Sequence, residues 1–376
     1  MRPDRVLVVN AGSSSVKLRL LDDDDTVLAR ADLEADHGRF DEAELCTAVT
    51  RLADGSVVAV GHRFVHGADE FTGAARLEPG ALDAIERLAA LAPLHQPPAV
   101  AAARAVMAAL PDIPAVGCFD TAFHTSLPAE AATYAVPQRW RSEFGVRRYG
   151  FHGLAHEWGA RRAAQLLGRP VTQLRTVVAH LGSGASLCAV HGGRSVDTTM
   201  GFTPTGGLVM GTRSGDLDPA VPSWLMSRHG LSADEVASDL DRRSGLLGLA
   251  GSADMREVLA ARDAGDAAAR LCVDVWLHRL AGQLASMTAA MGGLDVLVFS
   301  GGIGENTPTL RAAAAARLGF LGLSIDAAAN ADDGADRDIS APAATVRTLV
   351  VHAREDAVIA GHVRRLLAQE DPGAPG

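Results

Sequence analysis

A pattern of strand, turn and strand occurs twice in the sequence, about half a chain apart, and this repeat constrains the fold most. Residues 6–10 form an apolar, β-branched run, residues 11–15 are small, and residues 16–21 alternate between apolar and polar side chains. Residues 177–190 repeat this order around a second small-residue turn. Apolar runs joined by such a turn predict β-hairpins. Two hairpins in a chain of 376 residues predict a duplicated α/β fold, each half opening with a hairpin.

The hydrophobic patterns along the rest of the chain alternate between those of strands and those of helices. Strand-like runs occupy residues 57–60, 115–119 and 296–300. The spacing of apolar residues predicts helices over 80–91, 98–110, 156–167, 253–261 and 268–291. This alternation favours α/β, and 48% hydrophobic with 21% charged residues allow two core-bearing domains. We expect one lobe from residues 1–148 with 361–376, and a second lobe from residues 149–360.

The charge and the cysteine content argue against several classes of protein. A net charge of −10, with acids scattered along the chain, argues against nucleic acid or an anionic membrane surface as a partner. The four cysteines have no paired spacing, which argues against a zinc site or a disulfide framework. The sequence contains neither a signal-peptide pattern nor an uninterrupted apolar span. We therefore expect a soluble, cytoplasmic protein.

Three small-residue segments follow apolar strands and could surround phosphate oxygens with backbone N–H groups. The first runs over residues 10–17 and ends at Lys17, the only lysine of the chain. The others are residues 180–186 and 300–306, which we expect to be glycine turns. Each of these segments, taken alone, is more simply interpreted as a turn. The three segments together favour a nucleotide site. Residues 300–306 match neither a Walker loop nor the dinucleotide fingerprint, which disfavours a Rossmann oxidoreductase.

Arginine and histidine gather beside glycine in three segments, residues 62–67, 147–153 and 210–216. For each segment alone, a surface salt bridge or a hydrogen-bonded core histidine is the simpler interpretation. Beside three phosphate-type turns, the three segments together favour recognition of an anion.

Six segments resemble, in order and spacing, the signature of the acetate kinases, the acetokinase family of short-chain carboxylate kinases. They are residues 10–17, 62–67, 119–124, 148–153, 203–219 and 301–306. Six ordered motifs over nearly the whole chain are far more specific than one. The resemblance implies duplicated ribonuclease H-like domains of the actin, sugar kinase and heat-shock chaperone ATPase superfamily, with nucleotide in the interdomain cleft. It also implies a homodimer that reversibly transfers phosphoryl from ATP to acetate, giving ADP and acetyl phosphate, with Mg²⁺ or Mn²⁺ as cofactor.

Two alternatives stay open at this point. A propionate or butyrate kinase shares the fold and much of the signature, so the length of the acyl chain is not fixed. An actin-like or chaperone-type ATPase would use similar turns as a conformational switch. Such a switch has no need for carboxylate-binding arginines.

The resemblance assigns a role to individual residues of this sequence. Asn10 and Glu355 would hold the metal, while Asp120, His152 and Arg213 would be catalytic. Arg63 and Arg213 would bind the carboxylate. The acyl group would contact Val65, Leu94, Phe151 and Pro204. ATP would contact Ser13, Ser15 and Lys17, the turn His180, Leu181, Gly182, Ser183 and Gly184, the segment Asp254, Met255 and Arg256, and the segment Gly302, Ile303, Gly304, Glu305 and Asn306.

The chemistry of a carboxylate acceptor agrees with these roles. A carboxylic acid with a pKa of about 4 to 5 is already ionised at neutral pH, so the nucleophile needs no general base. The obstacle is the approach of one anion to another, which cations and alignment overcome. We therefore predict that Asp120 positions other groups and does not remove a proton. A methylene is worth about 1–3 kcal/mol of discrimination, so the preference for acetate over propionate should be modest.

Three positions depart from the family pattern. Ser183 stands where the family usually has asparagine, and Thr205-Gly206-Gly207 stands where it usually has Leu-Glu-Gly. Near the end, Ala353-Arg354-Glu355-Asp356 takes the place of Thr-Asn-Glu-Glu. These changes bear on the affinity for ATP and on the choice of phosphoryl donor.

Overall fold

The computed structural model describes residues 4–370 apart from 13–14, 37, 54 and 94, and it divides into two compact units. The first unit comprises Met1–Thr125, Phe151–Trp158 and Arg354–Gly376, and the second comprises Ser126–Gly150 and Gly159–Ala353. The boundaries expected from the sequence, after residues 148 and 360, differ from this division. Residues 148–149 bond to residues 198–201 of the second unit, and the helix that begins at Glu355 packs on the sheet of the first.

The sheet of the first unit has the strand order β3-β2-β1-β4-β6-β5. An antiparallel meander of β1 (Arg5–Ala11), β2 (Ser15–Leu21) and β3 (Val27–Glu34) opens the chain. Strands β4 (Val57–Phe64) and β6 (Ala115–Phe119) then add parallel to β1, and β5 (Ala75–Arg76) pairs antiparallel with β6. The hairpin predicted over residues 6–21 is confirmed.

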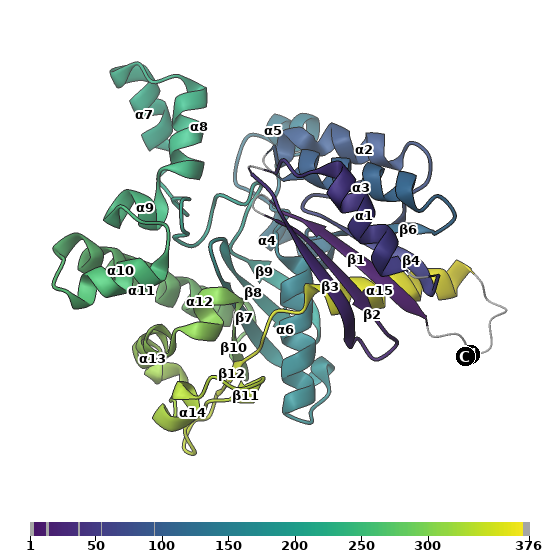
Figure 1. The fold of residues 1–376 in the computed structure, drawn as a ribbon. Coiled ribbons are helices and arrows are strands. Elements are labelled where there is room, and N and C mark those ends of the chain that lie inside the picture. The colour runs from purple at the N-terminus through teal and green to yellow at the C-terminus, as the bar shows by residue number, and fades with distance from the viewer. Residues whose placement is uncertain (1–3, 13–14, 37, 54, 94, 371–376) are drawn as a thin grey trace. The chain divides into compact units, whose positions relative to one another are not determined.

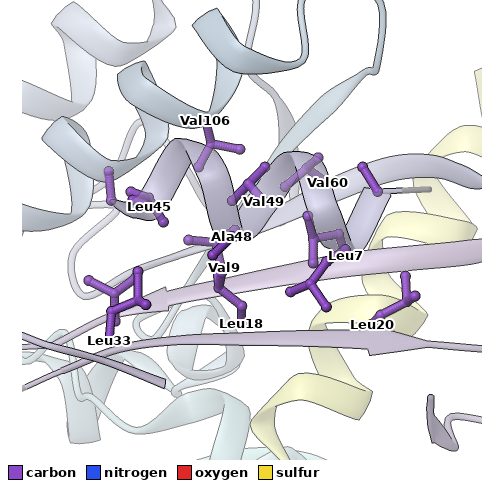
Figure 2. Packing of buried hydrophobic residues seen from close by; sticks show 14 of the residues in the cluster. Leu7, Val9, Leu18, Leu20, Leu33, Leu45, Ala48, Val49, Val60 and Val106 are labelled. Carbon is purple, nitrogen blue, oxygen red and sulfur yellow. The ribbon is translucent and has the colours of Figure 1, made fainter. Parts of the chain in front are cut away.

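Helices cover both faces of this sheet because its strands alternate apolar side chains between the two faces. On one face, Leu7, Val9 and Leu18 pack with residues of α1 (Glu42–Ala53) and α3 (Gln96–Ala109), as Figure 2 shows. On the other face, Val6 and Val8 pack with α15 (Glu355–Glu370). The unit also contains α2 (Ala81–Arg87), the 3₁₀ helices η1 (Leu88–Leu91) and η2 (Ala122–Ser126), and the start of α6 (Gly153–Leu166).

The sheet of the second unit repeats the same topology, with the order β11-β12-β10-β7-β8-β9. Strands β7 (Arg175–Leu181), β8 (Ala185–His191) and β9 (Arg194–Thr198) form an antiparallel meander. Strands β10 (Val296–Ser300) and β12 (Arg347–Val350) continue parallel to β7, and β11 (Arg337–Asp338) pairs antiparallel with β12. This repeated order confirms the predicted α/β fold of two ribonuclease H-like domains.

Most helices of the second unit lie between β9 and β12 along the chain. Figure 1 shows α7 and α8 as a pair of neighbouring helices, and a capping box at Ser232 starts α8. The bounds are α4 (Ala129–Ala132), α5 (Gln138–Phe144), η3 (Val171–Gln173), α7 (Ala220–His229), α8 (Ala233–Arg242), α9 (Gly245–Ala250), α10 (Met255–Asp263), α11 (Ala267–Ala290), α12 (Gly301–Asn306), α13 (Pro308–Arg317), η4 (Gly319–Leu321) and α14 (Ala327–Ala331). Within residues 4–370, apart from the gaps given above, every helix is too short or too polar to cross a membrane.

The predicted elements are confirmed with shifts at their ends, except for the segment after β10. The expected helix over residues 80–91 ends as 3₁₀ helix η1, and the expected strand over 57–60 continues to Phe64. Residues 300–306 were predicted to be a glycine turn, but the structure has the short helix α12 there. Gly301, directly after β10, has a left-handed φ of 76°, which glycine adopts without strain, and α12 begins at this residue.

The buried His62 of β4 predicts an acid-sensitive contribution to stability. Burial lowers the pKa of this imidazole from 6.5 to about 3. The unfolded chain therefore binds a proton at His62 below pH 6.5 and the folded chain does not, so stability is lost as the pH falls from 6.5 towards 3. At about pH 5 the loss should reach about 2 kcal/mol. In urea titrations between pH 7 and 5, His62→Gln should lose correspondingly less stability than the unchanged protein, and equal losses would contradict the prediction.

Candidate functional site

The first unit places four candidate residues at one edge of its sheet. Strands β1, β4 and β6 are parallel, so their carboxyl ends meet at the same edge. Asn10 lies near the end of β1, Arg63 lies near the end of β4, and Asp120 directly follows β6. Glu355, the first residue of α15, joins them there.

These four side chains form one connected network. The Arg63 guanidinium donates from Nε to Asp120 Oδ1 at 2.9 Å and from NH2 to Asp120 Oδ2 at 2.6 Å. Its NH1 donates to Asn10 Oδ1 at 3.2 Å. Asn10 Nδ2 in turn donates to Glu355 Oε2, also at 3.2 Å, and that oxygen lies 3.6 Å from Arg63 Nε. Both oxygens of Asp120 thus face a single guanidinium, in the bidentate geometry that arginine favours.

Burial and the neighbouring charges act in opposite directions on the pKa values of this network. Burial raises the pKa of the Asp120 carboxyl, while the Arg63 charge and a backbone hydrogen bond from His152 act in the opposite direction. Burial by itself would lower the pKa of Arg63, but the Asp120 and Glu355 carboxylates outweigh it and raise that pKa. Arg63 is therefore a permanent cation, and its charge stabilises the two acids beside it.

The backbone at His152 is held in a conformation that non-glycine residues rarely adopt. His152 has a φ of 56°, in the left-handed region. Gly153 N donates to the Asp120 carbonyl at 2.9 Å, and His124 Nε2 donates to the Phe151 carbonyl at 2.9 Å. Such strain persists only where neighbouring contacts impose it. The sequence did not indicate this role of His124, because a histidine in a short 3₁₀ helix has no distinctive pattern.

The predicted acyl pocket is only partly described. Val65 and Phe151 are both buried in the first unit, with exposures of 8% and 1%. Leu94 lies outside the described residues, and Pro204 belongs to the second unit. Burial fits an apolar lining and an ordinary core equally well.

The first predicted phosphate turn connects β1 to β2. Gly12 N donates to the Ser15 carbonyl at 2.9 Å, which closes the turn, and Ser13 lies outside the described residues. Lys17 is exposed on β2, opposite Asn10 in the strand register. Its position opposite Asn10 places the single lysine near the carboxyl edge of the sheet.

The second unit gathers two predicted nucleotide segments at the equivalent edge of its own sheet. His180 lies in β7 opposite Ser300 of β10, and the two strands are parallel. The turn over residues 181–184 is closed by a bond from Gly182 N to the Gly184 carbonyl at 3.0 Å. Helix α12 begins beside this turn, because an added Cβ at Gly301 would lie 2.8 Å from the Leu181 carbonyl oxygen. Gly301 therefore lets the two segments approach each other.

Two side chains fix α12 from its ends. Glu305 Oε1 accepts from Gly301 N at 2.8 Å and from Ala353 N at 2.9 Å, so this carboxylate organises the backbone. Arg311, only 1% exposed, donates from NH1 to the carbonyls of Gly304 and Glu305 at 2.9 and 2.7 Å. A cation suits these carbonyls because a helix ends in unpaired acceptors and partial negative charge. The sequence did not indicate this role of Arg311, because one arginine among 34 gives no signal.

The segment over residues 254–256 begins α10. Asp254 is the N-cap and accepts from Arg256 N at 2.8 Å. The Arg256 guanidinium pairs with the Asp254 carboxylate but stays 88% exposed. The exposed guanidinium of Arg256 is open to an anionic ligand.

Arg213 lies in the loop of residues 203–219 and differs from Arg63 in its partners. Its NH1 donates to the Pro204 carbonyl at 2.7 Å. No carboxylate of a described residue lies within ion-pair distance, and burial lowers the pKa of this guanidinium, with Asp241 opposing the shift. Arg213 therefore remains a cation with unused donors, as a site for an anion requires.

Each predicted cationic segment thus separates into distinct roles. Arg63 is paired with Asp120 and Glu355, Arg213 has no ion pair with a described residue, and His62 and His66 of the first segment are buried. Arg148 donates to the carbonyls of residues 198–200 and supports the end of β9. The structure brings Asn10, Arg63, Asp120 and Glu355 together in the first unit, and the turn 181–184 together with α12 in the second.

Two α/β units of one topology, with glycine segments and arginines at their sheet edges, are the features of a small-molecule phosphotransferase. The chain belongs to the acetokinase family, whose model matches residues 40–361. The acetate kinase of Micrococcus luteus is 46% identical over 94% of this chain and 97% of its own. The crystal structure of Porphyromonas gingivalis acetate kinase superposes with a TM-score of 0.87, at 35% identity, over 97% of this chain and 100% of its own. The crystal structure of a propionate kinase from Francisella tularensis also superposes with a TM-score of 0.87, at 34% identity, over 96% of this chain and 98% of its own.

Gly153→Ala should disturb the strained segment at His152. An added Cβ would lie 2.2 Å from the Asp120 carbonyl oxygen, so the backbone of one of the two residues must move. We expect a catalytic rate about 100-fold lower, because small misplacements of reacting groups have large effects. The control is Gly361→Ala in α15, where the new methyl group meets no atom within 4 Å and should raise the helix stability by about 1 kcal/mol. Full activity in Gly153→Ala would show that this contact does not position His152.

Proposed function

We propose that this protein is an acetate kinase, which transfers the γ-phosphoryl group of ATP to acetate and runs in both directions. Family membership over residues 40–361 makes a carboxyl group the acceptor. The observation that carries the proposal within the structure is Arg213, a half-buried guanidinium that has no carboxylate of a described residue within ion-pair distance. A hydrolytic ATPase needs no such group for its acceptor, because water is neutral.

The proposed step is an in-line displacement at the γ-phosphorus. A carboxylate oxygen of acetate forms a bond to phosphorus, and the bond between phosphorus and the bridging oxygen breaks, so the electron pair leaves with ADP. Charge spreads over the three equatorial oxygens in the transition state. We assign Arg213 and His152 to this charge, and Arg63 to the attraction of the acetate carboxylate.

Asp120 supports this chemistry by holding Arg63. Both of its oxygens accept from the Arg63 guanidinium, so neither is directed towards a proton of the acceptor. Acetate is ionised at neutral pH and offers no proton to remove. The ion pair supports our proposal that Asp120 is a positioning residue and not a general base.

The residues Asn10 and Glu355 fit a role towards Mg²⁺. Mg²⁺ prefers oxygen ligands and usually keeps several waters while it binds one or two carboxylates and the phosphates of a substrate. Glu355 supplies carboxylate oxygens, and Asn10 Oδ1 is an amide oxygen beside it. Over the part of the chain that the structure describes, no group of three His, Cys, Asp or Glu residues could hold a metal alone. We propose that the ion binds together with ATP and neutralises charge on its phosphate oxygens.

We assign ATP to the segments that the family resemblance names. In the second unit these are the turn His180–Gly184, residues 254–256 and residues 302–306; in the first unit they are Ser13, Ser15 and Lys17. The adjoining positions of the turn and α12 support this assignment. Since Glu305 already bonds two backbone amides, we expect it to shape the segment and not to contact ATP by its carboxylate.

We also propose a homodimer that acts in the cytoplasm, as the family resemblance implies. All four cysteines are free thiols, and Cys118, Cys188 and Cys272 are buried. Buried free thiols support a reducing compartment.

An assay that traps acyl phosphate as hydroxamate tests the proposal. With Mg²⁺ and ATP, acetate should give more product than propionate or butyrate, and Arg213→Ala should lower the rate at least about 100-fold. Arg228→Ala, an exposed arginine at the end of α7, is the matched control and should keep full activity. A higher rate with propionate would make the protein a propionate kinase. ATP hydrolysis that does not depend on any carboxylate would overturn the proposal.

The pH profile of Asp120→Asn distinguishes positioning from general base catalysis. Asparagine can accept only one of the two Arg63 hydrogen bonds and leaves the more distant Glu355 as the counter-charge, so we expect kcat to fall about 100-fold. The deficit should stay constant from neutral to alkaline pH, because no proton is removed in the reaction. Recovery of the rate at high pH would instead show that Asp120 acts as a base. Circular dichroism of the same samples confirms that the variant is folded.

A further inference from the structure

The position of Arg213 depends on two stretches of backbone in its loop. One stretch contains Arg213 itself, and the other contains Pro204, whose carbonyl accepts the bond from Arg213 NH1 at 2.7 Å. Among the described residues this carbonyl is the hydrogen-bond partner of the guanidinium. A shift of either stretch therefore moves the charged group.

The stretch around Arg213 is fixed by the start of α9. Ser244 N donates to the Thr212 carbonyl at 2.9 Å, and Leu246 N donates to the Met210 carbonyl at 2.9 Å. Gly245 has a φ of 63°, and an added Cβ would lie 2.1 Å from the Met210 carbonyl oxygen. This close backbone packing leaves little freedom at residues 210–213.

Asp241 of α8 contacts Thr205 and Thr212, the chain neighbours of Pro204 and Arg213. The Asp241 carboxylate accepts a short hydrogen bond from the Thr205 hydroxyl, next to Pro204. The Asp241 carbonyl accepts from the Thr212 hydroxyl at 2.8 Å, next to Arg213. Asp241 therefore joins the two stretches of loop that determine where the guanidinium lies.

The stability of α8 does not explain an aspartate at this position. Asp241 lies in the last turn of the helix, where the helix dipole disfavours negative charge. No cation of a described residue lies within ion-pair distance of its carboxylate, whereas its charge acts on Arg213. Its hydrogen bond to Thr205 is thus the principal contact of the carboxylate. Thr205 itself departs from the leucine of the family pattern, and leucine could not donate this bond.

We propose that Asp241 and Thr205 are positioning residues, which hold the Pro204 carbonyl and through it the Arg213 guanidinium in the geometry needed for phosphoryl transfer. The inference rests on the proposed function of Arg213. Catalytic groups need placement within about 0.5 Å, and supporting hydrogen bonds provide it. The Asp241 charge also favours the guanidinium in its buried position. Neither residue touches the substrates in this scheme.

Substitutions at Thr205 isolate the hydrogen bond. Thr205→Val keeps the shape of the side chain and removes the hydroxyl, so kcat for acetyl phosphate formation should fall about tenfold. KM for MgATP should not change, since the ATP segments keep their contacts. Thr205→Ser restores a hydroxyl and should restore the rate, which a loss of general stability would not predict. Unchanged kcat in Thr205→Val would overturn the inference.

Substitutions on α8 provide the matched control. Asp241→Ala should lower kcat as Thr205→Val does, and the two together should be no worse than either alone. Asp239→Ala also removes a carboxylate from α8. The Asp239 carboxylate pairs with the exposed Arg243, so its loss should leave kcat unchanged. Equal losses in Asp239→Ala and Asp241→Ala would mean that only the helix is weakened, which would contradict the proposed role.

A double-mutant cycle with Arg213→Lys tests whether Thr205 acts through Arg213. Lysine cannot reproduce the fork of the guanidinium, so adding Thr205→Val to Arg213→Lys should cause no further loss of rate. Additive losses would show that Thr205 acts elsewhere and would overturn the inference. Failure of the proposed function is a separate result, recognised when the unchanged protein forms no acyl phosphate or when Arg213→Lys keeps the full rate.

Discussion

The parallel pairing of three strands in each unit is the constraint on which the candidate site depends. In the first unit β1, β4 and β6 run the same way, and in the second unit β7, β10 and β12 do so. Residues separated by more than 100 positions in the sequence therefore arrive at one sheet edge, as Asn10 and Asp120 do. The carboxyl edge is also where the backbone leaves the sheet and its N–H groups become available. One topology, used twice, thus yields one edge rich in charged side chains and another rich in glycine.

Three arginines, Arg63, Arg213 and the buried Arg311, are stabilised in three different ways. Arg63 faces the carboxylates of Asp120 and Glu355, which raise its pKa. Arg311 is enclosed by carbonyls and the side chain of Asn330, and burial lowers its pKa to about 10. Arg213 has one carbonyl and only the distant charge of Asp241. A charge that is partly removed from water and weakly compensated is costly, so in the proposed function an anionic ligand gains most by binding at Arg213.

The sequence predicted the architecture well because its signals are local. Apolar runs around small-residue turns specify both hairpins, and helical spacing specifies α3, α10 and α11 to within a few residues. The helix over residues 301–306 was not predicted, because its glycine content suggests a turn, whereas the structure holds it through side-chain bonds from Glu305 and Arg311. Contacts such as Thr205 with Asp241 join positions 36 residues apart and leave no periodic trace. The roles of individual arginines likewise follow from their partners, which only the folded chain reveals.

The partners of Asp120 also decide what kind of kinase chemistry this site can support. A kinase acting on an alcohol needs a base for the hydroxyl proton, and a lone carboxylate would supply one. Here both carboxylate oxygens accept hydrogen bonds from Arg63, and withdrawing the carboxylate to accept a proton would leave that guanidinium with only the more distant Glu355 as its counter-charge. The arrangement is therefore poorly suited to an alcohol and well suited to an acceptor that is already an anion. In the proposed function, the ion pair between Asp120 and Arg63 therefore favours an anionic acceptor over an alcohol.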